Sequence, residues 1–414
     1  MRQHKQKAYT IDNASLLFLS LLQKNHSNSF RFTMTLTENV CPDTLQTAVD
    51  RIYRRFPTII ARFRAGFFHY LQIPVTEPPQ VQPDPGLLYT MSKQELGKCA
   101  FRVFYKENTV SIEVFHALTD GYGAIACFTT LMAEYLRLKH DIAIPVEKTL
   151  IDLNETPVHD EVSDAYERHE TGKPLLVPSR YSYQIPGQAP SIRGIKWVST
   201  KISTESLLDA SHHYGVSMTS LLSAIMAKSI MEQQLENTCG KASQPVRIMV
   251  PVDLRRMFPS KTLRNFVLYA LPTMEPHELN SPIAELLKSF GQQIKNQAER
   301  KRMASIMAYN VRTQDSWYFR AIPWFLKSLA LRIGYRIWGG SNSSVTVTNL
   351  GNIQLPDQMA PYVQDINVAL TPRARSPYGC GVLSYNGIVN ISISRYNPES
   401  TLENRFFRNL YSVL

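Results

Sequence analysis

A histidine with an aspartate and a glycine close behind it is the group of residues in this sequence best suited to chemistry. His116 follows an alternating apolar stretch, Ser111 to Phe115, and Asp120 and Gly121 lie in the turn that comes next. The pKa of an ordinary histidine is near neutral pH, so its imidazole can take a proton from a hydroxyl or an amine. The pattern indicates a general base, whereas a lone histidine is more often a surface or core residue without a catalytic role.

Two predicted elements position this turn. Residues 109–115 alternate as a strand, and apolar residues after the turn recur at three-and-four spacing, which is one face of a helix: Ile125, Phe128, Leu131, Met132, Tyr135 and Leu136. A strand-to-helix junction can hold a side chain at the mouth of a cleft without burying its whole ring. We therefore expect His116 at such a mouth.

Three blocks of the chain resemble a known family. Residues 115–121, FHALTDG, resemble the HHxxxDG motif of the chloramphenicol acetyltransferase-like superfamily, with Phe115 in place of the first histidine and His116 at the second. Residues 251–256, PVDLRR, with Asn265 shortly after, and residues 348–353, TNLGNI, are similar to blocks of the alcohol acetyltransferase-like branch. The motif alone is moderately specific, but the three blocks in this order are more so, and the resemblance extends over nearly the whole chain.

The resemblance implies an α/β protein with mixed sheets, made of two lobes with an active-site tunnel between them. It implies an acyl-CoA-dependent O-acyltransferase that moves an acyl group, acetyl in the first instance, from a coenzyme A thioester to an alcohol. His116 would be the catalytic general base, no covalent intermediate would form, and acyl-CoA would be a co-substrate with no cofactor bound permanently. The alternatives are condensation-like N-acylation of an amine acceptor from an acyl carrier protein, and a noncatalytic basic module that binds lipid or nucleic acid.

The resemblance also implies roles for the loop residues. In the family, the aspartate at the position of Asp120 points away from the substrate and pairs with an arginine, for which Arg255 is the match here. A solvated Asp120 that caps the helix beginning at Gly121 is the alternative. Gly121 would let the chain turn sharply.

Four residues are candidate oxyanion or substrate contacts. Thr346, Thr348 and Asn349 lie on a strand that resembles the family segment near the active centre, although strand threonines with ordinary cross-strand contacts are equally compatible with the sequence. Asn265 matches the second residue of a family "GN" pair, but Arg264 replaces the glycine and weakens the match.

Other chemistries find little support. Gly121, Gly123 and Ala126 fit a dinucleotide fingerprint, but the loop before them is long and the acidic residue that the fingerprint requires is missing. No zinc spacing, Walker loop or GxSxG elbow occurs, so no metal is expected. The cysteines Cys41, Cys99, Cys127, Cys239 and Cys380 form no CxxC pair, which favours free thiols in a reducing compartment.

The periodicity divides the chain into a first lobe at 1–150 that carries the motif, a proline-rich crossover at 151–190 that we expect on the surface, and a second lobe at 191–414. Strands are predicted at 28–39, 59–63, 67–73, 100–105, 109–115, 194–202, 246–252, 265–271, 344–348, 363–370, 380–385 and 388–394. Helices are predicted at 45–56, 121–139, 204–214, 218–235, 281–311 and 319–338 and from 399. Strands and helices mix without strict alternation, which favours mixed sheets over a doubly wound fold.

The net charge of +11 favours a partner with negative charge. Residues 300–336 hold eight arginines and lysines against one acid, Asp315, with aromatic residues between them. This segment could bind coenzyme A phosphates or a carrier protein, contact a membrane peripherally, or consist of packed helices with solvated arginines. Nucleic acid is not expected for the enzyme.

The N-terminus resembles a secretory signal only superficially. Arg2, Lys5 and Lys7 precede the apolar run at 16–22, but Asp12 and Asn13 interrupt, the run is short and no cleavage site follows. No apolar stretch is long enough to span a membrane. The sequence therefore favours the cytoplasm.

Overall fold

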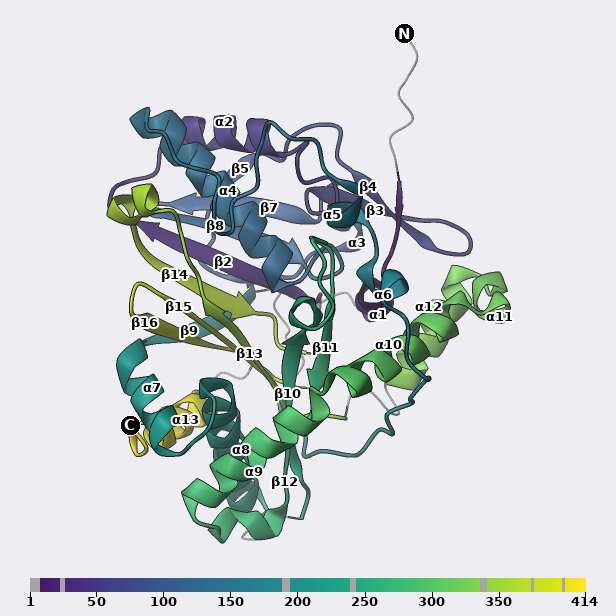
Figure 1. Cartoon of the computed structure of the whole chain (residues 1–414), viewed down its shortest axis with the longest axis vertical. Coiled ribbons are helices and arrows are strands. Elements are labelled where there is room, and N and C mark those ends of the chain that lie inside the picture. Colours follow the sequence, from purple (N-terminus) through teal and green to yellow (C-terminus); the bar gives the residue numbers. More distant parts are fainter. Residues whose placement is uncertain are drawn as a thin grey trace.

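A five-stranded sheet forms the centre of the first lobe. The computed structural model describes residues 8–22, 27–187, 194–238, 243–335, 341–373, 376–396 and 399–414. The sheet order is β14–β2–β8–β7–β5, with β2 at Ser29–Leu36, β5 at Val81–Pro83, β7 at Phe101–Lys106, β8 at Thr109–Phe115 and β14 at Val363–Leu370. Helices α2 (Pro42–Ile52) and α4 (Gly121–His140) lie together over it (Figure 1). The apolar faces that the sequence predicted on these elements form one core.

A larger mixed sheet of eight strands forms the second lobe. Its order is β11–β10–β13–β15–β16–β9–β6, and β12 pairs with β10 beside this path. The bounds are β6 Leu88–Tyr89, β9 Gly194–Ser203, β10 Val246–Asp253, β11 Val267–Ala270, β12 Thr273–Met274, β13 Val345–Asn352, β15 Tyr378–Tyr385 and β16 Ile388–Arg395. The pairs β10–β13 and β13–β15 are parallel and the other pairs are antiparallel, so the predicted mixed sheets are confirmed.

Helices cover the second sheet and build its own core. They are α7 (Thr204–His213), α8 (Met218–Asn237), α9 (Ile283–Gln297) and α13 (Thr401–Tyr411), with α8 packed against α9, α13 and β10. The predicted strands and helices of this half are present within a few residues, with two exceptions. The predicted helix at 281–311 is divided into α9 and α10 (Arg300–Asp315) at Glu299. The predicted helix at 319–338 is divided into α11 (Trp317–Ala321) and α12 (Trp324–Gly334), and its end at 336–338 lies outside the described residues. Local periodicity is a good guide here because each helix and strand has one clear buried face.

The lobes exchange strands. Strand β14, from the second half of the chain, pairs with β2 at the edge of the first sheet, and β6, from the first half, pairs with β9 in the second sheet. The sequence boundaries at 1–150, 151–190 and 191–414 stay a prediction about chain segments. In space, each sheet contains a strand from the other half.

The segment between the lobes is less exposed than predicted. Its described part, up to residue 187, contains the short helices α5 (His159–Val162) and α6 (Ala165–Arg168), and Glu161, Ala165 and Tyr166 are buried. Glu161 forms a bidentate ion pair with Arg55, with N–O distances of 2.7 and 2.9 Å. The prediction of a surface crossover is wrong for residues 161–166, because this polar segment finds charged and hydrogen-bonding partners inside.

A third, small sheet and a group of helices lie on the side of the molecule away from α7 and α13 (Figure 1). The sheet order is β1–β4–β3, with β1 at Tyr9–Thr10, β3 at Ala61–Ala65 and β4 at Tyr70–Pro74. Helices α1 (Asn13–Ser20), α10, α11 (Trp317–Ala321) and α12 (Trp324–Gly334) lie beside it (Figure 1). The remaining turns are α3 (Lys93–Leu96), η1 (Leu254–Arg256), η2 (Pro276–Asn280) and η4 (Asp357–Tyr362).

Helix α1 contains most of the apolar run that the sequence offered as a weak signal peptide. It begins after Asp12, whose carboxylate accepts hydrogen bonds from the backbone N–H and the hydroxyl of Ser15 at 2.8 and 2.7 Å. The acidic residue that argued against a signal is therefore the N-cap of a helix. No helix in the described part of the chain has both the length and the apolarity needed to cross a bilayer.

Candidate active site

His116 lies at the end of β8, in an aromatic environment. Its backbone N–H donates to the carbonyl of Asn28 at 2.8 Å, which extends the antiparallel pairing of β8 with β2 by one residue. The imidazole stacks on the ring of Phe18 with centroids 4.4 Å apart, and Phe30 meets it edge-on at 5.0 Å. Phe18 comes from α1 and Phe30 from β2, so two elements distant in sequence fix the plane of the ring.

The surroundings of the ring favour its neutral form. Burial lowers the pKa of His116 below its ordinary value, although its own backbone carbonyl, Asp120, Asn265 and Asp12 act in the opposite direction. Its Nδ1 atom is buried and makes no hydrogen bond to another described residue. A neutral imidazole at neutral pH is the form that accepts a proton, which is what a general base requires.

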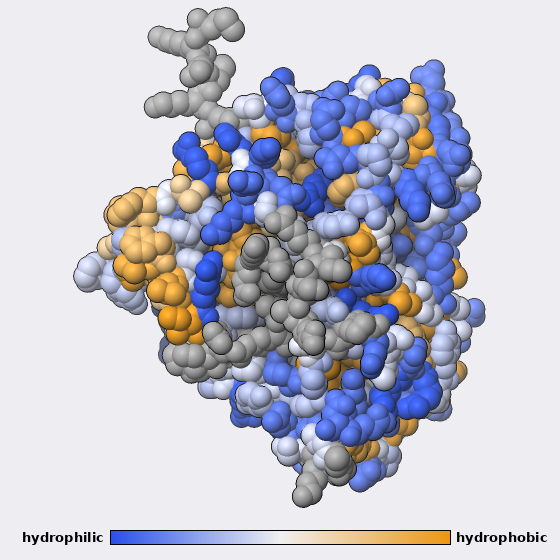
Figure 2. Space-filling view, turned by 180° about the vertical axis from the view of Figure 1, so that it is seen from behind, coloured by the Kyte–Doolittle hydropathy of each residue, from blue (hydrophilic) through white to orange (hydrophobic). Residues whose placement is uncertain are grey.

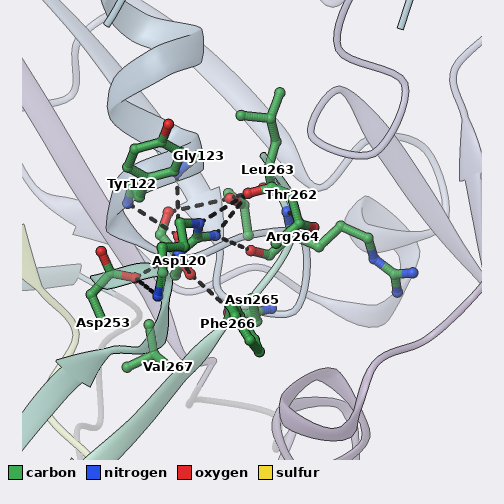
Figure 3. Close-up of polar contacts among 12 residues, drawn as sticks. Asp120, Tyr122, Gly123, Asp253, Thr262, Leu263, Arg264, Asn265, Phe266 and Val267 are labelled. Carbon is green, nitrogen blue, oxygen red and sulfur yellow. Dashed lines mark hydrogen bonds and ion pairs between the residues drawn. The ribbon is translucent and has the colours of Figure 1, made fainter. Parts of the chain in front are cut away.

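Asn265 fixes the backbone of the histidine. This asparagine is 2% exposed, and its Nδ2 donates to the carbonyl oxygen of His116 at 3.1 Å. The neighbouring Arg264, which stands where the family has glycine, points the other way: it donates to the carbonyl of Thr10 at 2.6 Å and lies 3.5 Å from the carboxylate of Asp12. The side chain of Arg264 extends away from Asp120 (Figure 3), and Asn265 is left in contact with the backbone of His116.

Asp120 uses both oxygens for structure. Its Oδ1 accepts from the backbone N–H groups of Tyr122 and Gly123 at 3.1 and 3.2 Å, which caps α4. Its Oδ2 accepts from Arg255 Nη1 and from the backbone N–H of Phe266, both at 2.8 Å (Figure 3). Four donors occupy this carboxylate, and none of them is the imidazole, so a catalytic triad through Asp120 finds no support in the geometry.

Arg255 is the partner that the resemblance implied. Besides Asp120, its guanidinium binds Asp253 at 3.0 Å and donates to the carbonyls of Thr262 and Arg264. Burial opposes the charged form, but the two carboxylates outweigh it and raise the pKa of Arg255. The ion pair and the helix cap, which the sequence left as alternatives, are both present in one carboxylate.

The glycines bring the three sequence blocks together. A Cβ at Gly121 would overlap the side chain of Leu350, and one at Gly123 would overlap the carbonyl of Leu263 and the hydroxyl of Thr119. The start of α4 therefore touches the block at 348–353 on one side and the block that follows η1 on the other. The motifs that lie far apart in the chain meet within contact distance of the loop that follows His116.

No contact in the described structure connects Thr346, Thr348 or Asn349 of β13 to His116. Thr346 and Thr348 lie in β13, between β10 and β15, and within the described residues their hydroxyls make no hydrogen bond. Asn349 is already engaged, because its amide donates to Thr219 at 3.1 Å and accepts from the backbone of Gly351 at 2.9 Å. Of the four candidate contacts, Asn265 alone is held on His116, and an oxyanion role for the other three stays a prediction.

Sequence reasoning missed Phe18. The apolar run that contains it was judged only as a targeting signal, and nothing in its spacing points to a histidine about a hundred positions later. Asp12 was the available hint, because an aspartate followed by an apolar run is a common start of a helix.

Two cavities lie away from His116. One, of about 710 Å³, is lined by the crossover, β11, α9 and α10, and includes Arg180, Arg247 and Arg302 together with Glu275 and Glu278. The other, of about 700 Å³, lies under the proline-rich segment at 75–85. His116 lines neither of them, so the tunnel at the histidine stays a prediction.

Solved structures share this fold at low sequence identity. Polyketide synthase associated protein 5 from Mycobacterium tuberculosis matches with a TM-score of 0.62 and 13% identity, over 98% of this chain and 97% of its own. The trichothecene 15-O-acetyltransferase TRI3 of Fusarium sporotrichioides matches at 0.58 and 12%, over 99% and 95%. TRI101 of F. graminearum, solved with coenzyme A and deoxynivalenol, matches at 0.60 and 12%, over 96% of each chain.

These likenesses confirm the predicted two-lobed fold. No family model matches the chain, and no curated protein matches it in sequence.

Proposed function

We propose that the protein is an acyltransferase that moves an acyl group, in the first instance acetyl, from a coenzyme A thioester to an alcohol, with His116 as general base. The observation that carries this is the half-buried imidazole at the end of β8, whose buried Nδ1 makes no hydrogen bond to another described residue, on a fold shared with acetyltransferases. The cytoplasmic location belongs to the same proposal.

The chemistry needs one proton acceptor. The acceptor oxygen attacks the thioester carbonyl carbon while the imidazole of His116 takes the hydroxyl proton. The tetrahedral intermediate then collapses, the carbon–sulfur bond breaks, and the imidazolium returns the proton to the departing thiolate. Ester and free thiol are the products, and no bond to the enzyme forms. Asp120 and Arg255 hold the loop through the contacts described above and do not touch the reacting atoms.

A coenzyme A donor is supported by charge as well as by the coenzyme A in the TRI101 structure. Arg247 is buried beside Arg180, and burial together with that neighbouring charge lowers the pKa of Arg247. Among the described residues, no carboxylate is hydrogen-bonded to Arg180 or Arg247, and both line a cavity large enough for part of a cofactor. This arrangement favours a ligand with negative charge. Glu275 and Glu278 on the same wall limit the excess of positive charge.

Carrier-dependent N-acylation is the second candidate. It is supported by the similarity in fold to the starter condensation domain of rhizomide synthetase RzmA, solved with C8-CoA and Leu-SNAC. A carrier-bound thioester would need the same proton transfer at His116. The two candidate functions therefore share the general base and differ in the acyl donor and the acyl acceptor.

The test measures thiol release from acetyl-CoA with a panel of alcohols and amines. We expect release that depends on an alcohol, and a loss of about 10²- to 10⁴-fold in the His116→Ala variant. His212→Ala is the matched control, because this exposed histidine of α7 lies outside the site. Wild-type turnover by His116→Ala, or release that ignores the acceptor, would overturn the proposal. Release with amines alone would favour N-acylation.

A further inference from the structure

The outer face of α12 is apolar, and its inner face contains a lysine. Phe325, Leu329 and Ile333 recur at four-residue spacing and are 64%, 54% and 50% exposed, whereas Lys327 on the other face is 6% exposed. A helix that covers a core normally shows the reverse arrangement. The apolar stripe of α12 therefore lies on the outer surface and is not covered by the described part of the chain.

The stripe is part of a larger surface. We define the aromatic surface as the exposed apolar side chains of α11, α12, the turn between them and the tip of the β3–β4 hairpin: Phe67, Phe68, Trp317, Tyr318, Ile322, Phe325, Leu326, Leu329 and Ile333. Trp317 is 81% exposed and Phe67 is 68% exposed. From behind the molecule, apolar side chains gather on a protrusion at the left edge, where Figure 1 places α11 and α12 (Figure 2). A protrusion does not offer a groove to a peptide or a helix.

The surface is held in place by the buried lysine. Lys327 Nζ donates to the carbonyl of Phe68 at 2.9 Å and to that of Arg320 at 3.4 Å, and the backbone N–H of Trp324 donates to the carbonyl of Phe67 at 2.7 Å. Hairpin, α11 and α12 are thus connected by hydrogen bonds that do not involve the exposed rings. Burying a lysine is unfavourable, and here the buried lysine holds exposed aromatic rings in place. This arrangement indicates that the exposed apolar surface binds something.

The charge of the surface selects the kind of partner. Segments 61–74 and 316–335, which form it, contain no aspartate or glutamate. Of their five cations, Lys327 is buried and Arg62 lines the cavity at 75–85, which leaves Arg64, Arg320 and Arg332 for the surface. Asp315 comes just before and binds Arg320 at 2.7 Å. A second copy of this chain would bring the same cations face to face, which disfavours self-association. Aromatic residues mixed with cations are instead the composition of surfaces that insert at the lipid–water boundary.

We propose that the aromatic surface docks the protein on an anionic phospholipid bilayer, with Phe67, Trp317 and Phe325 inserted at the boundary. Helix α12 packs against α1, and α1 supplies Phe18, which stacks on His116. The docked face therefore lies one helix away from the candidate active site. A substrate that partitions into lipid would reach the histidine from this side, but the docking itself does not depend on the proposed reaction.

The experiment is co-sedimentation with vesicles in the absence of any substrate. The wild-type protein is mixed with phosphatidylcholine vesicles and with equimolar phosphatidylcholine–phosphatidylserine vesicles, and we expect binding to the second. The triple variant Phe67→Ser, Trp317→Ser, Phe325→Ser is expected to bind at least about tenfold more weakly. Arg64→Ser is expected to weaken binding about fivefold, because one cation at the membrane surface is lost.

Tyr411→Ser is the matched control, since this residue is 55% exposed on α13, at the opposite side of the molecule (Figure 1). A second measurement is needed if the triple variant does not fold. Brominated lipid should quench the tryptophan fluorescence of the wild-type protein more than that of Trp317→Phe. No binding to anionic vesicles, or binding that only Tyr411→Ser weakens, would overturn the proposal. So would an aromatic surface that proves to join two copies in analytical ultracentrifugation. Because no turnover is measured, these outcomes are separate from a failure of acyl transfer.

Discussion

The Asp120–Arg255 contact offers the sharpest quantitative test of the structure. Asp120 is 1% exposed and lies 2.8 Å from Arg255, whose side chain is 7% exposed. Breaking a buried ion pair from one side costs about 3–5 kcal/mol, because the remaining charge loses its partner. In Asp120→Ala, Arg255 keeps Asp253 and the carbonyls of Thr262 and Arg264, which places the expected loss near the lower end.

The other losses in Asp120→Ala act in the same direction. The cap of α4 is worth about 1 kcal/mol, and the buried N–H of Phe266 loses its acceptor at a cost of about 1–3 kcal/mol. Since all these contacts share one carboxylate they do not add, and we expect a total decrease of about 3–4 kcal/mol in the free energy of unfolding. Asp120→Asn keeps the cap and should lose about 1 kcal/mol less than Asp120→Ala.

The assay is urea unfolding of a double-mutant cycle. We expect Arg255→Met to lose about 2–3 kcal/mol, because Asp120 retains three backbone donors, and the double variant to show a coupling of at least about 1.5 kcal/mol. Arg256→Met is the matched control: it is the next residue and exposed, and should change the free energy of unfolding by less than about 0.5 kcal/mol. Additive single losses, or an Asp120→Ala variant as stable as Arg256→Met, would refute the proposed coupling.

Four further predictions follow from the contacts of the loop and its surroundings. Because burial lowers the pKa of His116, kcat/KM should rise with pH through an apparent pKa below 6.5 and level off near neutrality, and a midpoint above 6.5 in the pH–rate profile would contradict this. Asn265→Ala frees the carbonyl of His116 and should lower kcat about tenfold with KM little changed, so a change in KM alone would count against a positioning role. Gly123→Ala would force a Cβ onto the carbonyl of Leu263 and should lower the free energy of unfolding by about 1–3 kcal/mol, as measured by thermal unfolding. Gly291→Ala in α9 is the control: its Cβ would meet Val216 and Ser220 at ordinary contact distances, so the variant should be as stable as the wild type or more stable. Burial and the charge of Asp12 raise the pKa of Asp164 to about 7, so the folded state binds the proton more tightly than the unfolded state and stability is lost as pH rises from 4 toward 7. Asp164→Asn should therefore be more stable than wild type at pH 8 and lose that advantage at pH 4, and equal unfolding free energies at both pH values would show that this carboxyl is not perturbed.

Local elements were predictable because their signal is local. The alternation of β2 and β8 and the three-and-four spacing of α4 and α8 are read from neighbours in the chain, and the structure contains these elements within a few residues. Two failures have the same explanation. The run at 16–22 and the segment at 161–166 are too short or too polar to show a period, and their conformation depends on partners elsewhere, such as Arg55 for Glu161.

The residues around His116 also show which features the sequence could predict and which it could not. Residue types and spacing brought out His116 with Asp120, and the resemblance to the family added Arg255 as the partner of Asp120. Spacing could not show that the carboxylate of Asp120 serves four donors at once, or that Asn265 holds the carbonyl of His116 in spite of Arg264. These are distances between side chains more than a hundred residues apart, and they depend on how the lobes pack.

By itself, the sequence determined the order of most helices and strands and the mixed α/β class. Each of these depends on residue type or on a repeat within about ten positions. Only the tertiary structure decided that β14 and β6 change lobes, that Phe18 stacks on His116, and that α12 turns its apolar face outward. The physical reason is that burial and contact are properties of the packed chain, and a residue's neighbours in sequence do not fix its neighbours in space.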